Sequence, residues 1–215
     1  MRVFFVSGSD TNVGKTHTTL NLVRLLQAQG KKALAIKPIE TGVQTLPQDC
    51  LLHLKDAQNL FPHFTLQDIN LYSLPLPASP FVADSLGEID IQKIFSHITA
   101  LSDEVEILLI EGAGGLFVPI KRDYFMLSFA LELQERFESE VIFVCDDRLG
   151  MLNRLLSGKF ILESKGLKSH YFINLREREE FERTSLPFLL SSSTPFESNL
   201  EQLAQEIMRT FHKVP

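Results

Sequence analysis

Cysteine and tryptophan are scarce in this chain. Of its 215 residues, two are cysteine, Cys50 and Cys145, and none is tryptophan. Two cysteines cannot build the disulfide framework of a small secreted protein, and they lack the paired spacing of a structural zinc site. We therefore expect a reducing, cytoplasmic compartment. Cys145 ends a strand of buried type, where a small core residue is more usual than a nucleophile.

The chain also lacks an excess of positive charge and any long apolar run. Its formal net charge is −6, so we expect neither nucleic acid nor a membrane surface as a partner. No apolar stretch reaches the length of about 20 residues that a membrane-spanning helix needs. Residues 1–6 enter a short strand directly, unlike a cleavable signal. With 44% hydrophobic residues, the chain can bury a sizeable core, and we expect one domain over residues 1–215.

Apolar runs of strand length alternate with amphipathic segments of helical spacing along the whole chain. The predicted strands lie near 3–6, 32–37, 105–110, 141–145, 169–174 and 186–190, and the predicted helices near 18–26, 49–60, 91–101, 126–137, 151–164 and 200–211. Residues 39–48 are predicted to be a loop, and prolines make residues 61–87 irregular with short helices. The alternation predicts an α/β fold with a doubly wound, mostly parallel sheet and helices on both faces. Ligands of such sheets gather at the carboxyl ends of the strands.

A glycine-rich segment near the N-terminus carries the clearest chemical signal. Residues 8–16, here called the P-loop, read Gly-Ser-Asp-Thr-Asn-Val-Gly-Lys-Thr. They match G-x-x-x-x-G-K-[ST] between an apolar strand and an amphipathic helix. Such a loop directs backbone N–H groups at phosphate oxygens, while its Lys reaches the β and γ phosphates and its Thr hydroxyl ligates Mg²⁺. The segment therefore predicts a P-loop NTPase-like nucleotide site.

Three more charged residues stand where predicted elements begin or end. Glu111 closes an apolar strand and precedes glycines, as an acidic Mg²⁺ ligand would, although a solvated strand end gives the same pattern. Asp49 could ligate the metal or cap the helix that it begins. Lys37 ends the second strand, where a second cation could stabilise a transferring phosphoryl group. Its plain alternative is a solvated lysine.

Five segments follow one another in a characteristic order. They are the P-loop, Lys37-Pro38-Ile39-Glu40-Thr41-Gly42, Ala78-Ser79-Pro80, Glu111-Gly112-Ala113-Gly114-Gly115 with Val118-Pro119, and Leu149-Gly150-Met151-Leu152-Asn153. In order and spacing, up to about Asn174, they resemble the dethiobiotin synthetase family.

The resemblance implies an ATP-dependent cyclo-ligase that converts 7,8-diaminopelargonate and CO₂ to dethiobiotin, ADP and phosphate. In the family's chemistry one amine takes up CO₂ as a carbamate, and a carbamate oxygen then attacks the γ-phosphorus of ATP. The other amine displaces phosphate from the carbamic-phosphoric anhydride and closes the ring. No protein nucleophile is needed, in agreement with the lack of a convincing Ser/His/Asp or Cys/His set in the sequence. The family also implies Mg²⁺ and a homodimer.

The family's roles carry over position by position. The catalytic residues would be Lys37, Lys15 and Thr11, and the Mg²⁺ ligands Thr16, Asp49 and Glu111. The nucleotide would contact Asn12, Val13, Gly14, Lys15, Thr16, His17, Glu111, Gly112, Ala113, Gly114, Asn174 and Pro187. The substrate would contact Thr11, Lys37, Thr41, Pro80 and Gly114, and, across the dimer interface, Gly150, Met151, Leu152 and Asn153 at a helix start.

Two groups of residues either depart from the family's pattern or show no spacing that indicates a role. The adenine site is the loosest match, because residues 175–180 are shorter and more charged than the family's loop, and the nucleotide base preference stays open. His17 could face the phosphates, but a helix-surface histidine has the same spacing. The remaining histidines show no metal-ligand spacing and receive no role; they are His53, His63, His97, His170 and His212.

Three other functions compete with the ligase. A P-loop switch or partitioning ATPase would carry a lysine directly after the first loop glycine, where Ser9 stands. A ligase of the cobyrinate amidotransferase class would need a further glutaminase domain, for which 215 residues leave no room. A structural nucleotide-binding protein would require the Lys37 and Glu111 segments to be accidental.

Overall fold

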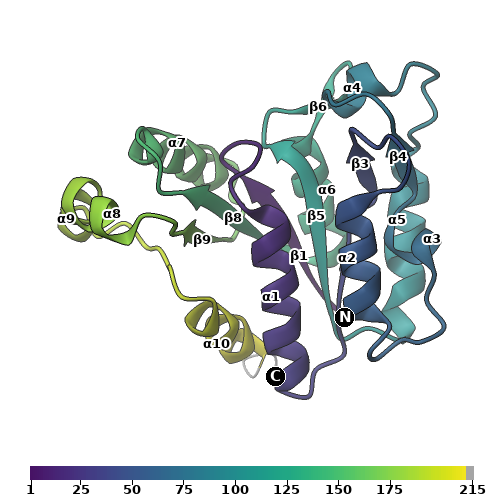
Figure 1. The fold of residues 1–215 in the computed structure, drawn as a ribbon, viewed down its shortest axis with the longest axis horizontal. Coiled ribbons are helices and arrows are strands. Elements are labelled where there is room, and N and C mark those ends of the chain that lie inside the picture. Colours follow the sequence, from purple (N-terminus) through teal and green to yellow (C-terminus); the bar gives the residue numbers. More distant parts are fainter. Residues whose placement is uncertain (212–215) are drawn as a thin grey trace.

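A five-stranded sheet with the order β2-β5-β1-β8-β9 runs through the computed structural model, which describes residues 1–211 (Figure 1). Every neighbouring pair of its strands is parallel. These strands are β1 (Arg2–Gly8), β2 (Ala33–Ile36), β5 (Ile107–Gly115), β8 (Glu140–Asp146) and β9 (Ser169–Asn174). Two small sheets accompany it, formed by β3 (Ile39–Thr41) with β4 (Tyr72–Leu74) and by β6 (Pro119–Lys121) with β7 (Tyr124–Phe125). The doubly wound, mostly parallel fold predicted from the sequence is confirmed.

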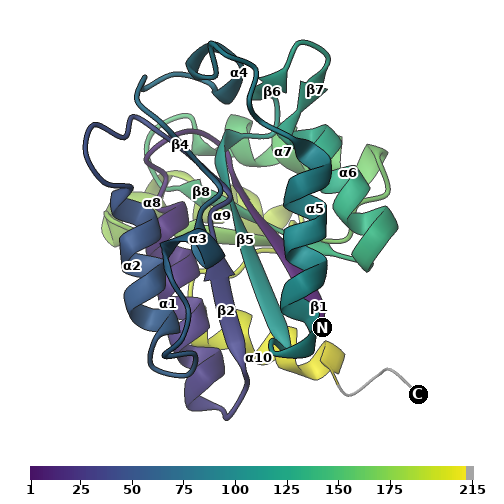
Figure 2. The same ribbon diagram turned by 90° about the vertical axis from the view of Figure 1, so that its right-hand side faces the viewer.

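Helices cover both faces of the large sheet (Figures 1 and 2). In chain order they are α1 (Lys15–Ala28), α2 (Gln48–Ala57), α3 (Leu66–Ile69), α4 (Pro80–Ala83), α5 (Ile91–Ala100), the short 3-10 helix η1 (Leu101–Asp103), α6 (Met126–Phe137), α7 (Met151–Ser164), α8 (Arg178–Thr184), α9 (Leu186–Ser191) and α10 (Leu200–Phe211). Side chains of α1 and α10 pack in one apolar cluster, while those of α5, α6 and α7 pack in the other. No helix among residues 1–211 combines the length and apolar character that crossing a membrane would require.

The central strand β1 shows why the sheet is buried on both sides. Phe4 and Val6 point into the cluster beneath α1 and α10, and Val3 and Phe5 point into the opposite cluster. Successive side chains of a strand face opposite ways, so a continuous apolar run supplies both cores at once. The polar residues that follow such runs are thereby placed at one edge of the sheet.

The structure corrects three local predictions. Residues 186–190 form helix α9 rather than a strand, and Pro187 lies in its first turn, where a missing N–H costs nothing. The predicted loop 39–48 begins with the short strand β3. Asp49 is not a helix cap: Pro47 occupies that position, and Asp49 lies in the first turn of α2. There its negative charge also favours the helix N-terminus.

A cluster of charged residues joins α10 to the sheet at the end opposite to the P-loop. His170 of β9 is buried, and its Nε2 lies 2.8 Å from Glu140 Oε2, while its Nδ1 lies 3.1 Å from Glu206 Oε1. Arg2 Nη2 completes the cluster, 2.8 Å from Glu140 Oε1. Burial would lower the pKa of His170, but hydrogen bonds to Glu140 and Glu206 raise it to about 9.

This cluster should make the free energy of unfolding depend on pH. Because the His170 pKa is raised on folding, its stabilisation is complete below the unfolded value of about 6.5 and is lost as pH rises to about 9. We expect the free energy of urea unfolding of the wild type to fall by on the order of 2 kcal/mol across that window, relative to that of His170→Gln. If the free energy of unfolding changed equally with pH in the two proteins, the raised pKa assigned to His170 would be contradicted.

Candidate active site

The P-loop joins β1 to α1 and is shaped for an anion. Gly14 precedes α1 with a φ of +99°, a left-handed conformation that glycine adopts without strain. The first turn of α1 has no acidic residue, so its free N–H groups face the loop with their positive dipole end uncompensated. Lys15 is buried, and its Nζ donates to the Asp10 carbonyl oxygen at 3.0 Å. Val13 packs in the core, which leaves its backbone as the part that can face a phosphate.

Asn174, the last residue of β9, and Arg176, just after it, hold the P-loop from outside. Asn174 Nδ2 donates to the Val13 carbonyl at 3.0 Å, and Arg176 Nη2 donates to the Asn12 carbonyl at 2.5 Å. Asp147 in turn accepts the backbone N–H groups of Arg176 and Glu177 at 2.6 and 2.7 Å. The loop is therefore tied to the ends of β8 and β9 through side-chain hydrogen bonds.

Glu111 is the centre of the site. It lies within β5, opposite Val6, and its carboxylate is buried. Its Oε1 accepts from Thr16 Oγ1 at 2.7 Å and from Lys37 Nζ at 2.9 Å, and its Oε2 lies 2.9 Å from His53 Nε2. Lys37 Nζ also contacts Asp49 Oδ2 at 2.5 Å. The structure thus brings together Thr16, Lys37, Asp49 and Glu111, which the sequence had placed at separate element ends.

The two lysines differ in their charge environment. Burial and the neighbouring Lys37 lower the pKa of Lys15 to about 8, with Glu111 opposing them. Burial would also lower the pKa of Lys37, but the Glu111 and Asp49 carboxylates raise it above its usual range. Burial likewise opposes ionisation of Glu111, yet Lys37 and His53 hold the pKa of this carboxyl far below its ordinary value. Lys37 is therefore a fixed cation, and Lys15 is the lysine that a bound anion would stabilise most.

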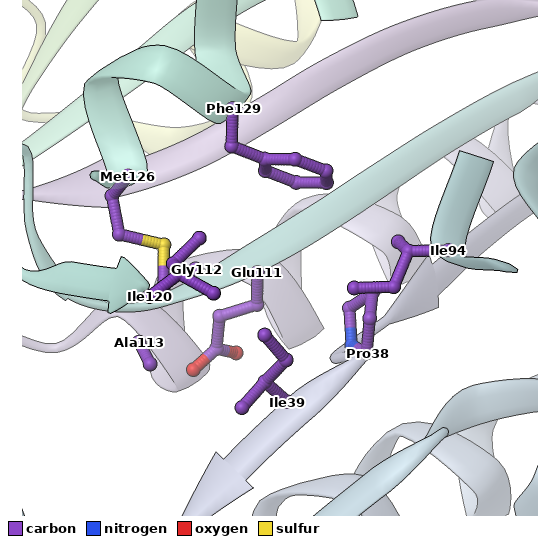
Figure 3. Close-up of a pocket in the computed structure, with 9 residues that line it drawn as sticks. All are labelled: Pro38, Ile39, Ile94, Glu111, Gly112, Ala113, Ile120, Met126 and Phe129. Atoms are coloured by element: carbon purple, nitrogen blue, oxygen red, sulfur yellow. The ribbon is translucent and has the colours of Figure 1, made fainter. Parts of the chain in front are cut away.

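An apolar wall stands behind the Glu111 carboxylate. In Figure 3 this carboxylate lies beside Ile39 and Ala113, and Ile94, Ile120, Met126 and Phe129 line the small pocket that adjoins it. Water is largely excluded from this side of the site. Charge interactions at Glu111 are stronger in such surroundings than at an open surface.

A cavity of about 820 Å³ opens in front of these groups. It is lined by twelve of the residues predicted from the sequence: Thr11, Asn12, Gly14, Lys15, Thr16, Lys37, Thr41, Asp49, Pro80, Glu111, Ala113 and Gly114. His17 and Asn174 instead line an adjoining cavity of about 640 Å³ beside α1. Pro187 lies exposed on α9 and borders neither cavity. The roles assigned to these residues stay predictions.

The predicted substrate residues 150–153 stand apart from both cavities. Gly150 precedes α7 with a φ of +86°. Asp146, fully buried at the end of β8, anchors this helix start through Arg148 and through Arg154 Nη2 at 2.7 Å. Within one chain, residues 150–153 therefore do not face the P-loop cavity.

Two residues of the site were missed in the sequence. Arg176 lines the larger cavity, and His53 contacts Glu111. His53 follows Asp49 by four residues on α2, a spacing that places both on one helix face; that spacing was the available signal. The other histidines have structural partners: His63 pairs with Glu104, His97 with the Asp68 carbonyl and His170 with Glu140. His212 lies outside the described residues.

The residues present fit a magnesium ion bound together with a triphosphate. Thr16, Asp49 and Glu111 offer one hydroxyl and two carboxylates, the hard oxygen donors that Mg²⁺ uses beside phosphate oxygens. Within residues 1–211, no group of three or more His, Cys, Asp or Glu side chains could hold a metal ion.

Comparison with known proteins assigns the family. Residues 2–204 match a family model described as an AAA domain. The ATP-dependent dethiobiotin synthetase BioD of Sulfurovum sp. is 41% identical over 87% of this chain and 90% of its own length. The protein of the same name from Wolinella succinogenes is 36% identical over 97% and 99% of the two chains. The chain belongs to the dethiobiotin synthetase family.

Solved structures outside this family share its fold. A plasmid partition protein of Borrelia burgdorferi, bound to AMPPNP, superposes with a TM-score of 0.57 at 13% identity over 99% of this chain and 98% of its own. The cell division protein MinD of Aquifex aeolicus gives 0.53 at 16% identity over 91% and 80% of the two chains. At such identities the likeness concerns the fold alone. It confirms the P-loop NTPase-like architecture of this family member.

Proposed function

We propose that this chain is an ATP-dependent cyclo-ligase that forms dethiobiotin from 7,8-diaminopelargonate and CO₂, releasing ADP and phosphate. The observation that supports it most directly is the position of Lys37, whose Nζ lies 2.9 Å from Glu111 at the edge of the P-loop cavity. A nucleotide-binding loop alone would serve a switch as well as a ligase. A second buried cation facing the same cavity suits a reaction with an anionic acceptor.

In the proposed reaction, one substrate amine adds to CO₂ and loses a proton to form a carbamate. A carbamate oxygen bonds to the γ-phosphorus as the bond from this phosphorus to the ADP oxygen breaks. The second amine then attacks the carbonyl carbon, phosphate leaves, and the amine proton is released as the ring closes. Lys15 and Lys37 stabilise the charge on the carbamate and on the phosphoryl group, and Thr11 and Thr41 hydrogen-bond the carbamate or the amines. Holding the reactants in line and neutralising charge are the protein's contribution.

We assign the Mg²⁺ site to Thr16, Asp49 and Glu111. When bound, the ion would neutralise charge on the β and γ phosphate oxygens. The three residues reach the cavity from α1, α2 and β5. The lysines then stabilise the charge of the groups that react.

We further propose a homodimer in which residues 150–153 hold the substrate carboxylate beside the partner's cavity. The helix start at Gly150 offers free N–H groups for an anion. Leu149 beside it is 92% exposed, as suits a residue that a second chain covers. A sedimentation mass of a single 24.4 kDa chain at micromolar concentration would contradict this assignment.

We place the enzyme in the cytoplasm and treat residues 1–215 as one P-loop domain. Both cysteines are free and buried, which suits a reducing compartment. The large sheet combines strands from the N-terminal and the C-terminal parts of the chain, and each apolar cluster does the same with its side chains.

The function is tested by incubating the purified protein with diaminopelargonate, bicarbonate and Mg²⁺, separately with ATP, CTP and GTP. We expect phosphate release that depends on diaminopelargonate, with dethiobiotin formed in equal amount. Matched reactions without diaminopelargonate control for simple hydrolysis. Substrate-independent phosphate release with every nucleotide would instead favour a P-loop ATPase switch.

A further inference from the structure

His53 is the one partner of Glu111 that lies behind the carboxylate, away from the cavity. The imidazole is buried, with its side chain 0% exposed, and its Nε2 lies 2.9 Å from Glu111 Oε2. The two other donors, Thr16 and Lys37, both bind Oε1. The carboxylate therefore has one oxygen that faces the cavity and one oxygen fixed by the histidine.

The ring of His53 makes no other hydrogen bond within residues 1–211. Its Nδ1 is buried and has no hydrogen-bond partner there. Because ionised Glu111 can only accept, the hydrogen of this contact belongs to Nε2 of the ring. A histidine kept only to fill the core would usually have both ring nitrogens satisfied, since a buried polar atom without a partner destabilises the fold.

We propose that His53 is a positioning residue that fixes Glu111 for metal binding. By donating to Oε2, it stops the carboxylate from turning and keeps Oε1, the oxygen on the side of Thr16 and Lys37, directed toward the proposed Mg²⁺ site. His53 and Asp49 lie four residues apart on α2, so this helix supplies both a proposed metal ligand and the group that orients another. The inference rests on the proposed function insofar as Glu111 is a magnesium ligand there.

The size of the effect follows from similar arrangements in metalloproteins. Groups that hydrogen-bond a metal ligand typically contribute about 10- to 100-fold to metal affinity. His53 does not border the P-loop cavity. Its loss should therefore weaken metal binding, while metal-free nucleotide binding and the KM for diaminopelargonate stay close to those of the wild type.

Two variants of similar polarity separate positioning from packing. The side-chain amide nitrogen of His53→Gln extends about as far as the imidazole Nε2 and can donate to Glu111, whereas that of His53→Asn ends near the position of Nδ1. Mn²⁺ is titrated into each full-length protein holding a non-hydrolysable ATP analogue, and free Mn²⁺ is followed by electron paramagnetic resonance. Thermal unfolding of the same samples reports the packing cost.

We expect His53→Asn to raise the Mn²⁺ dissociation constant about 10- to 100-fold and His53→Gln to restore it to within about threefold of the wild type. Equal Mn²⁺ affinities in the two variants would overturn the inference, whatever their thermal stabilities. Should His53→Asn fail to fold, His53→Leu replaces it, because its side chain keeps the apolar packing without a donor. Mn²⁺ binding needs no diaminopelargonate, so a positive result in a protein that forms no dethiobiotin would reject the ligase and retain the positioning role.

Discussion

Lys37→Met should lower kcat about a thousand-fold and change the affinity for ATP no more than about threefold. Lys37 Nζ is held between Asp49 Oδ2 and Glu111 Oε1, at 2.5 and 2.9 Å, and its raised pKa keeps it charged over the working pH range. It makes no hydrogen bond to the P-loop backbone in the described part of the chain. The variant therefore loses a fixed cation facing the acceptor while the phosphate-binding backbone is retained.

Lys15→Met is the matched control for this result. Lys15 is also buried and also lines the cavity, but it begins α1 within the P-loop and donates to Asp10. We expect its loss to weaken ATP binding and turnover together, as removal of a contact to the phosphates should. Turnover and nucleotide affinity are measured by the dethiobiotin assay and by calorimetry. Wild-type kcat in folded Lys37→Met would refute the catalytic role of this lysine.

Removal of Lys37 also leaves two carboxylates facing each other across the site. Glu111 keeps Thr16 and His53 as donors, and the Asp49 side chain is 36% exposed, so water can solvate it. We expect this partial compensation to let the variant fold. Breaking a fully buried ion pair costs more, because the remaining charge then has neither a partner nor water.

Much of the fold could be predicted because the strands of the large sheet are buried on both faces. The helices at 126–137 and 151–164 and the strand at 169–174 begin and end where the apolar periodicity placed them. The apolar periodicity predicts the wrong element where tertiary contacts determine the local structure. The run at 186–190 is apolar enough for a strand, yet it lies on the surface and a proline favours its helical first turn.

The candidate site could be predicted only in part, for a geometric reason. Lys37 and Glu111 are 74 residues apart, but both stand near carboxyl ends of parallel strands, which meet at one edge of the sheet. His53 does not end a strand, because it lies within a helix, and its partner Glu111 is 58 residues away. Its four-residue spacing from Asp49 is the only signal for it, and that spacing is common on helices.

The glycines after Glu111 illustrate a second limit. From the sequence they suggest a backbone that approaches phosphate closely. In the structure, a Cβ on Gly112 would lie 2.7 Å from the Phe5 ring, and one on Gly115 would lie 3.0 Å from the Gly8 carbonyl. Packing between β5 and β1 is sufficient to require glycine at both positions. Gly114, with a φ of +75°, does line the cavity, so the run combines packing and proposed binding roles.

Gly14→Ala should weaken ATP binding about a hundred-fold. A non-glycine residue at its φ of +99° is strained by about 1–2 kcal/mol. The new Cβ would also lie 2.1 Å from Asn174 Nδ2, so the Asn174 side chain must leave and lose its hydrogen bond to Val13, which is worth about 1 kcal/mol. The sum of about 2–3 kcal/mol corresponds to roughly a 30- to 150-fold change in affinity if it falls on the binding-competent loop.

Gly30→Ala and a double variant separate the two contributions. Gly30 has a φ of +80°, and a Cβ added there would meet nothing within 4 Å among the described residues, so Gly30→Ala should show backbone strain in its thermal stability and unchanged ATP affinity. Adding Asn174→Ala to Gly14→Ala removes the clash and keeps the strain. Affinity should then stay within about twofold of that of Gly14→Ala alone, because Asn174→Ala gives up the same hydrogen bond to Val13 that the clash removes. If calorimetry gave the same ATP affinity for Gly14→Ala and the wild type, the loop conformation seen here would not be the one that binds nucleotide.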